Sequence, residues 1–177
     1  MWLNIIPRYV DWQINQANSW EIHKLEEQIE NIKISPYINI SGIIDRIDIN
    51  QNKLCVIDYK TGVTPDSESV LSGEAIQLPF YALIADTQLS HQRAVETNEM
   101  HYLSLSQDKF GLKISLNEED LADLKPQVSK RLTDIFNDIH NGQPLPAWGD
   151  NSTCSRCSME GICRKQVWRT TNAHTNI

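Results

Sequence analysis

The sequence contains no apolar run of the roughly 20 residues that a membrane-spanning helix requires. Its N-terminus, MWLNIIPRYVDW, also lacks the basic region and the cleavage pattern of a secretory signal peptide. Positive charge is not in excess, because 16 Lys and Arg residues stand against 23 Asp and Glu, a net charge of −7. This balance is weak evidence against a large nucleic-acid surface, which would need clustered Lys and Arg. We therefore expect a cytoplasmic protein without a membrane partner.

Cysteine is scarce, with four residues in the whole chain. Three of them lie within ten residues, in CSRCSMEGIC, which is unlike the scattered cysteines of a secreted disulfide scaffold. In a cytosolic protein the CxxC spacing points first to a metal. A GxGxxG motif after a strand is absent as well, so the sequence does not have the pattern of a dinucleotide-binding Rossmann domain.

The remaining composition is that of an ordinary globular protein of 177 residues, 40% apolar and 22% charged. This length suits one domain with a substantial core. We expect that domain over residues 1–150, followed by a cysteine-containing segment with several basic residues over 151–177.

Apolar residues at helical spacing predict three helices, and β-branched residues alternating with polar ones predict five strands. The predicted helices cover residues 2–17, 74–85 and 117–142, and the predicted strands cover 20–34, 37–49, 54–60, 100–106 and 111–116. Polar residues predict loops over 63–73 and 86–99, and Pro126 predicts a kink or a division in the last helix. This order of elements predicts an α/β protein with a mixed β-sheet flanked by helices.

Two charged residues, Asp58 and Lys60, interrupt an otherwise apolar strand in the stretch VIDYKTG, residues 56–62. Alternate side chains of a strand share a face, so these two lie side by side. Burying either charge alone costs several kcal/mol, which calls for a partner, a cation or a function. One interpretation is a simple ion pair at the end of a strand.

The preceding strand carries a second carboxylate, Asp45, on the same face as Ile43 and Ile47, and Gly42 lets a neighbouring backbone come close. A hairpin between the two strands would set Asp45 beside Asp58, where two carboxylates repel each other unless a cation lies between them. Mg²⁺ fits this need because it binds carboxylate oxygens and accepts phosphate oxygens from a substrate. The second interpretation is therefore metal-dependent phosphodiester hydrolysis, with an ammonium group alongside to orient water or stabilise charge.

The stretches GIIDRID, VIDYKTG and QLPFY resemble the motifs of the PD-(D/E)XK nuclease superfamily. The resemblance is to the branch that contains the AddB and RecB nuclease domains and the CRISPR-associated nucleases with an iron–sulfur cluster. It covers residues 20–85 and 154–163, and it implies a restriction-endonuclease-like α/β fold. Under this resemblance Asp45 and Asp58 correspond to metal-binding acids and Lys60 to the catalytic lysine. The backbone carbonyl of Tyr59 corresponds to a further metal ligand.

The resemblance also assigns Gln77 and Tyr81 to a QxxxY motif that positions DNA. Their i, i+4 spacing puts both on one helical face. The alternative for this pair is the polar edge of an amphipathic helix. Glu26 and Glu27 lie where the family often has another acid, and an exposed strand face explains them as well.

Cys154, Cys157 and Cys163 have a CxxC-x5-C spacing similar to the last three ligands of the iron–sulfur nucleases. This implies a 4Fe–4S cluster whose fourth ligand lies outside this chain. Cys55 is instead predicted to be a small buried residue on the strand face opposite Asp58. Zinc is the competing metal, with His174 or an outside group as fourth ligand. Because no upstream cysteine is available as the fourth ligand, we expect a C-terminal fragment of a larger helicase–nuclease-type protein.

Together the motifs imply a Mg²⁺- or Mn²⁺-dependent deoxyribonuclease acting as an exonuclease on single-stranded or duplex DNA ends in recombination and repair. The implied partner is a helicase subunit or an upstream helicase-like domain. One alternative is a catalytically inactive module that binds DNA ends in a helicase–nuclease complex. Another is a structural domain in which the charged residues only form ion pairs.

Overall fold

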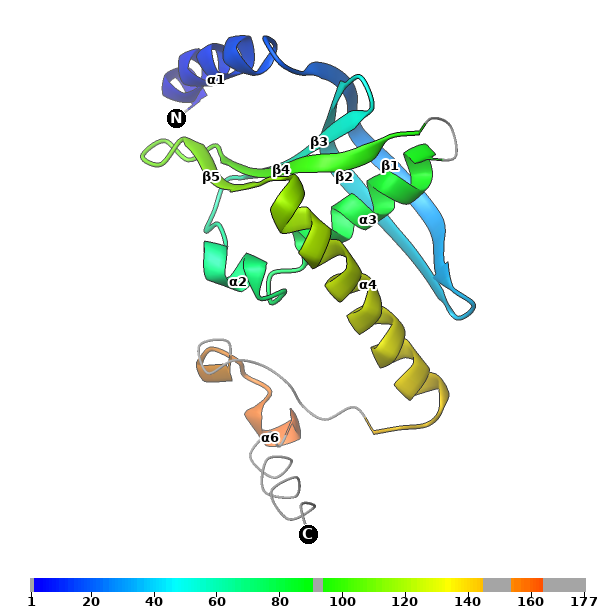
Figure 1. The fold of residues 1–177 in the computed structure, drawn as a ribbon. Helices are drawn as coiled ribbons and strands as arrows, with labels where there is room; N and C mark the ends of the chain where they lie inside the picture. The colour runs from blue at the N-terminus through cyan, green and yellow to red at the C-terminus, as the bar shows by residue number, and fades with distance from the viewer. Residues whose placement is uncertain (1, 91–93, 145–153, 164–177) are drawn as a thin grey trace. The chain divides into compact units, whose positions relative to one another are not determined.

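The computed structural model describes residues 2–90, 94–144 and 154–163. The chain forms two compact units, residues 1–134 and 135–177. The first unit holds the β-sheet and the helices that pack on it (Figure 1), and the second holds the cysteine segment. Among the described residues, no helix combines the length and the apolar character that crossing a membrane requires.

A five-stranded sheet forms the centre of the first unit. Its strand order follows the sequence: β1 (Glu21–Ser35), β2 (Ile38–Asn50), β3 (Lys53–Lys60), β4 (Glu96–Ser104) and β5 (Gly111–Leu116). Strands β3 and β4 are parallel, whereas the other neighbouring strands are antiparallel. The mixed sheet predicted from the order of the elements is therefore confirmed.

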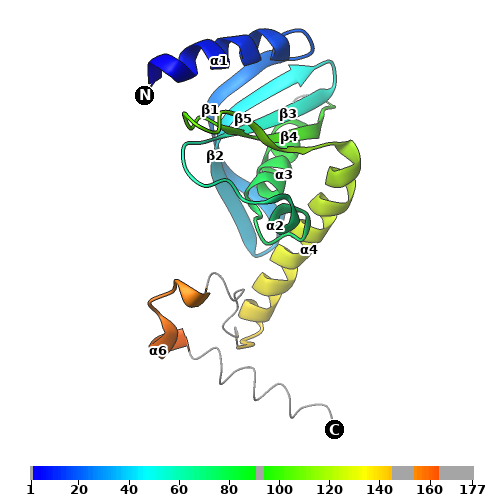
Figure 2. The same ribbon diagram turned by 90° about the vertical axis from the view of Figure 1, so that its left-hand side faces the viewer.

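Helices cover both faces of this sheet (Figure 2). Helix α1 (Trp2–Gln16) packs on one face, and α3 (Gln77–Ser90) and the first part of α4 (Glu118–His140) pack on the other. The connection from β3 to β4 contains the short helix α2 (Ser67–Leu71) and then α3. Parallel strands require such a crossover, since a tight turn can join only antiparallel strands. The second unit contains α6 (Glu160–Cys163).

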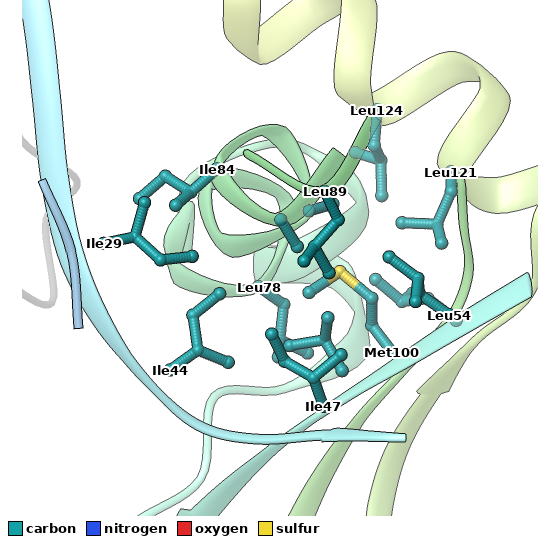
Figure 3. Packing of buried hydrophobic residues seen from close by; sticks show 14 of the residues in the cluster. Ile29, Ile44, Ile47, Leu54, Leu78, Ile84, Leu89, Met100, Leu121 and Leu124 are labelled. Carbon is teal, nitrogen blue, oxygen red and sulfur yellow. The ribbon is translucent and has the colours of Figure 1, made fainter. Parts of the chain in front are cut away.

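The larger hydrophobic core lies between the sheet and the helices α3 and α4 (Figure 3). Each fully buried aliphatic side chain in such a core contributes roughly 1.5–3 kcal/mol to folding. The contributing residues include Ile44, Ile47 and Leu54 from the sheet and Leu78, Ile84 and Leu121 from the helices. This core fixes the start of α3 close to the end of β3.

A smaller core lies on the opposite face of the sheet, beneath α1. Cys55, Ile57 and Leu103 are fully buried there, and Tyr9 and Trp12 of α1 pack against them. Cys55 thus occupies the face that the sequence predicted for it, away from the side chain of Asp58.

The face beneath α1 also contains a buried ion pair, Arg46 with Asp48, and both side chains are fully shielded from solvent. Arg46 Nε and Nη2 donate to the Asp48 carboxylate at 2.6 and 2.7 Å. Arg46 Nη1 donates to Gln13 Oε1 and, at 3.4 Å, to the Tyr9 hydroxyl. A buried ion pair is tolerated only when its hydrogen bonds are satisfied in this way. Arg46 therefore connects α1 to the centre of the sheet.

The predicted loop over residues 86–99 is wrong at both ends, because α3 continues to Ser90 and β4 begins at Glu96. Polar residues at these ends pair with one another across distant parts of the chain. Asp86 Oδ1 accepts from the backbone N–H of Thr97 at 2.6 Å, and Lys125 Nζ of α4 donates to Asp86 and Glu96. Because these polar residues find their partners in distant elements, residues 86–99 lack the apolar alternation that would have predicted a strand or a helix.

Three local predictions concern helix ends and proline. The predicted loop over residues 63–73 contains α2, whose N-cap Asp66 accepts from the Ser69 N–H at 2.7 Å. Helix α4 runs through Pro126, so the predicted division is wrong. The helix predicted from residue 117 begins at Glu118, where Asn117 caps it by accepting from the Glu119 N–H at 2.9 Å through Oδ1.

Replacing Arg46 by Met should destabilise the protein by about 3–5 kcal/mol, because the buried Asp48 carboxylate loses its partner. The double variant Arg46→Met with Asp48→Leu removes both charges and should recover most of this loss. Urea unfolding followed by circular dichroism measures the difference.

Lys53→Met provides the matched control, because the Lys53–Glu118 ion pair is exposed and its loss should barely move the unfolding midpoint. A double variant as unstable as Arg46→Met would show that Arg46 does not stabilise the fold through Asp48.

Candidate active site

Three side chains form a closed set of polar contacts where β3 ends and α3 begins. Gln77 Nε2, at the first residue of α3, donates to Asp58 Oδ1 at 2.7 Å. Lys60 Nζ donates to Gln77 Oε1 at 2.6 Å and lies 2.8 Å from Asp58 Oδ2. The strand alternation that places Asp58 and Lys60 on one face therefore aims both at the start of α3.

Asp45 joins this group from β2. Antiparallel pairing sets Arg46 opposite Ile57, and Asp45 precedes Arg46 on β2 as Asp58 follows Ile57 on β3. Asp45 Oδ2 accepts from the backbone N–H of Tyr59 at 2.8 Å. The two carboxylates are near enough for the charge of Asp45 to raise the pKa of Asp58, as the predicted neighbourhood requires.

The strand around Asp45 departs from the simple alternation that the sequence predicted. Ile47 is fully buried, but Ile43 is 55% exposed, so these two residues do not share one environment. Ile44 is buried in the same core cluster as Ile47, although they are three positions apart. The in-and-out pattern of β2 shifts between them, and Asp45 lies in this irregular part.

Asp58 has an unusual electrostatic environment, because its side chain is almost completely buried. Burial raises the pKa of Asp58, and the charge of Asp45 raises it further, whereas Lys60 opposes this rise. Lys60 Nζ lies 2.8 Å from Asp58 Oδ2, but its charge offsets the effect of burial only in part. The ionised carboxylate is therefore incompletely compensated by the chain itself.

Tyr81 lies one helical turn after Gln77 and extends the same network. Gln77 Nε2 donates to the Tyr81 hydroxyl at 3.2 Å, so both residues lie on one face of α3 as predicted. Gly42 of β2 makes room for this face. A Cβ atom on Gly42 would lie 3.1 Å from Ile84 Cδ1 and 3.4 Å from Tyr81 Cε1. The close neighbours of Gly42 are thus side chains of α3, not the backbone that the sequence analysis expected.

Tyr102 is a site residue that the sequence analysis missed. It pairs with Asp58 across the parallel strands β3 and β4. Its hydroxyl donates to Gln77 Oε1 at 3.5 Å, and its ring centroid lies 5.1 Å from Lys60 Nζ. Burial raises the pKa of the Tyr102 hydroxyl, which therefore keeps its proton. Only the parallel crossover brings Tyr102 here, and no local motif marks it.

The side chain of Tyr59 points away from this site. Its hydroxyl lies 3.0 Å from the Tyr9 hydroxyl beneath α1, so only the backbone of Tyr59 can serve the Asp58 face. Glu26 and Glu27 lie on β1, where Glu26 is exposed and Glu27 forms an ion pair with Lys24 at 3.4 Å.

The second unit contains the three clustered cysteines, none of which forms a disulfide. The backbone N–H of Cys157 donates to the Cys154 carbonyl at 3.2 Å, and the N–H of Met159 donates to Cys157 Sγ at 3.4 Å. Cys163 ends α6. His174, the candidate zinc ligand, lies outside the described residues, as do residues 164–177 as a whole.

Replacing Asp58 by Asn should stabilise the metal-free protein against urea at neutral pH. The pKa of Asp58 in the folded state is above its ordinary value of 3.8, so folding favours the protonated form. Stability is therefore lost as the pH rises through the folded pKa, and the neutral amide of the variant escapes this loss. The advantage of the variant should shrink as the pH falls and should vanish below 3.8, where Asp58 is protonated in both states.

Unfolding of both proteins would be compared across this pH range with a chelator present. Asp108→Asn, in an exposed loop, serves as the control for a change of net charge. A variant that is less stable than the natural sequence at neutral pH would contradict the explanation by burial.

Comparison with known proteins agrees with this geometry. A family model described as the PD-(D/E)XK nuclease superfamily matches residues 1–164. The chain is also 22% identical over 154 residues to the CRISPR-associated exonuclease Cas4 of Francisella tularensis subsp. novicida (strain U112), a match that covers 85% of this chain and 71% of that protein. Because the family match spans far more than half of the residues, including β2, β3 and α3 with their polar side chains, this chain belongs to the PD-(D/E)XK nuclease superfamily.

Proposed function

We propose that this nuclease is a Mg²⁺- or Mn²⁺-dependent deoxyribonuclease, with Asp45, Asp58 and Lys60 as its catalytic centre. The observation that carries the proposal is the buried Asp58 carboxylate, with Asp45 near enough to raise its pKa further and Lys60 2.8 Å away. A merely structural ion pair would gain nothing from a second carboxylate next to it, because like charges repel.

The donor atoms at this site fit a hard divalent cation. Asp58 Oδ2 has the Lys60 ammonium group 2.8 Å away, and Asp45 Oδ2 accepts from the Tyr59 N–H, so both carboxylates keep lone pairs for a cation. Carboxylate and carbonyl oxygens are the ligands that Mg²⁺ and Mn²⁺ prefer. In this proposal Asp45, Asp58 and the backbone carbonyl of Tyr59 hold the cation. When bound, it supplies charge stabilisation at the phosphate and a more acidic water.

In this proposal the Lys60 ammonium group interacts with the reacting phosphate, and Gln77 holds the ammonium group in position. The ammonium group is positioned by the Gln77 amide oxygen at 2.6 Å and by the ring of Tyr102. Its positive charge can orient a water or stabilise the negative charge that develops at phosphorus. Gln77 and Tyr81 line the same face of α3, where their polar groups are available to position the DNA strand.

The proposed substrate is DNA with single-stranded or duplex ends. An exonuclease activity is favoured by the similarity to a protein named CRISPR-associated exonuclease Cas4. Relation to the AddB and RecB nuclease domains, a role in recombination and repair, and a helicase partner are further parts of the proposal, and they rest on the resemblance of the sequence motifs.

The cysteine segment is proposed to supply three ligands, Cys154, Cys157 and Cys163, to a 4Fe–4S cluster. None of the three cysteines forms a disulfide, and the N–H of Met159 donates to Cys157 Sγ at 3.4 Å. Backbone N–H groups that donate to cysteine sulfur are among the contacts that tune iron–sulfur clusters. A fourth ligand would come from outside this set.

Lys60→Ala should lower the rate of DNA cleavage by roughly 100-fold or more, because the charge that stabilises the transition state is lost. Asp45→Asn and Asp58→Asn should abolish cleavage by removing cation ligands. Cleavage of end-labelled single-stranded and duplex DNA, with Mg²⁺, with Mn²⁺ or with chelator, measures these effects.

Lys53→Ala is the matched control, because it removes an exposed lysine from the opposite end of the same strand. Calorimetric titration with Mn²⁺ separates binding from chemistry: Lys60→Ala should still take up the ion, and Asp58→Asn should not. Cleavage that survives Lys60→Ala unchanged would rule out this mechanism. DNA-end binding without any cleavage would favour an inactive binding module.

The protein purified without oxygen should contain iron and absorb visible light, and Cys157→Ser should lose both properties. Iron analysis and the visible spectrum of the two proteins provide the measurement. A colourless protein that retains zinc through Cys154 and Cys163 would replace the cluster by a zinc site.

A further inference from the structure

A second group of potential metal ligands lies on the face of the sheet opposite Asp58. Cys55 of β3 is the direct neighbour of Glu99 of β4 in the parallel ladder, and His101 follows two residues later on the same face. The thiol, one carboxylate oxygen and one ring nitrogen of these three residues all lie within 4.8 Å of one another. Two neighbouring strands in the middle of the sheet hold them, so their spacing does not depend on a loop.

The burial of the three residues combines a protected interior with one open side. Cys55 is fully buried and the His101 side chain is 5% exposed, whereas the Glu99 side chain is 42% exposed. A cation can therefore reach the group past Glu99, while water is largely excluded behind it.

His101 is incompletely satisfied by the protein. Its Nε2 lies 3.2 Å from Glu99 Oε2, and its Nδ1 has no hydrogen-bond partner among the described residues. Nε2, not Nδ1, faces Glu99, so Nε2 is the ring nitrogen that a cation shared with Glu99 would bind. Among the contacts of the described residues, the Glu99 carboxylate is the only anionic group that touches the imidazole ring.

The distances agree with coordination by one small cation. Zinc bonds of about 2.0–2.1 Å to nitrogen and oxygen at a tetrahedral angle place two such ligand atoms about 3.3 Å apart. The Nε2 to Oε2 distance of 3.2 Å already matches this value. Thiolate, imidazole and carboxylate together select zinc over Mg²⁺ or Mn²⁺, which prefer oxygen ligands alone.

We infer that Cys55, Glu99 and His101 form a zinc site with three protein ligands and a fourth position open to water. On binding, the S–H bond of Cys55 breaks, a zinc–sulfur bond forms, and the proton leaves to solvent. The nearby Arg46–Asp48 ion pair contributes little net charge, because its two members carry opposite charges 2.6 Å apart. The negative charge that attracts the cation is therefore that of Glu99.

The site would connect β3 to β4 directly behind the candidate active site. The register of the two strands places His101 opposite Ile57, and the next pair is Asp58 with Tyr102. A metal that joins these strands would fix this register. The inference does not depend on the proposed nuclease function, because its ligands lie on the other face of the sheet.

The test uses cobalt as a visible substitute for zinc in the full chain carrying Cys154→Ser, Cys157→Ser and Cys163→Ser, in which Cys55 is the only cysteine left. Added Co²⁺ should give a thiolate-to-cobalt charge-transfer absorption, and added Zn²⁺ should bleach it. Oxygen ligands at Asp45 and Asp58 cannot produce this absorption. Cys55→Ala should abolish it, and Glu99→Gln or His101→Asn should weaken Co²⁺ binding at least about tenfold.

His23→Asn, at an exposed position on β1, is the matched control and should leave the absorption unchanged. Absence of the absorption in the folded protein, or an absorption that is indifferent to His101→Asn, would overturn the inference.

If circular dichroism shows that the triple variant is unfolded, zinc content is measured in the otherwise natural chain with and without Glu99→Gln. The exposed Glu99 can be changed with little effect on packing, and the variant should hold one zinc equivalent fewer. Equal zinc content in the natural chain and the Glu99→Gln variant would also overturn the inference.

Discussion

The buried carboxylate of Asp58 is the constraint on which the arrangement of the site depends. A charge in that position must be compensated, and the chain does so only in part, through Lys60 on the same strand and Gln77 at the start of α3. The compensation requires α3 to begin at the end of β3. The core beneath α3 provides that placement, because Leu78 and Ile84 anchor the helix to the sheet.

Strand β3 serves two environments because its side chains alternate. Asp58 and Lys60 face α3, whereas Ile57 and Tyr59 face α1. The two faces are linked through the backbone of Tyr59, whose N–H is bound by Asp45 while its side chain contacts Tyr9. Helix α1 therefore packs on one face of the β3 segment whose other face carries Asp58 and Lys60.

Much of the fold and the centre of the site could be predicted because their signals are local. Alternation within one strand placed Asp58 beside Lys60, a short turn placed Asp45 opposite them, and helical spacing placed Gln77 with Tyr81. Tyr102 could not be found in this way, since only the pairing of β3 with β4 across a long crossover brings it to the site. The early part of β4 was missed for a related reason: its polar residues are satisfied by Lys125 and Asp86 from distant helices.

Lys60 and a divalent cation compete for the same carboxylate oxygen. The ammonium group lies 2.8 Å from Asp58 Oδ2, whereas Oδ1 accepts from Gln77 Nε2 at 2.7 Å. If Asp58 binds a cation as proposed, Lys60 must give up part of this contact, because two positive groups at one oxygen repel each other. Gln77 offers the lysine a second anchor, since its amide oxygen accepts from Lys60 Nζ at 2.6 Å. A neutral amide at the start of α3 can thus hold the lysine near the reacting phosphate without competing for the metal, which a carboxylate there would do.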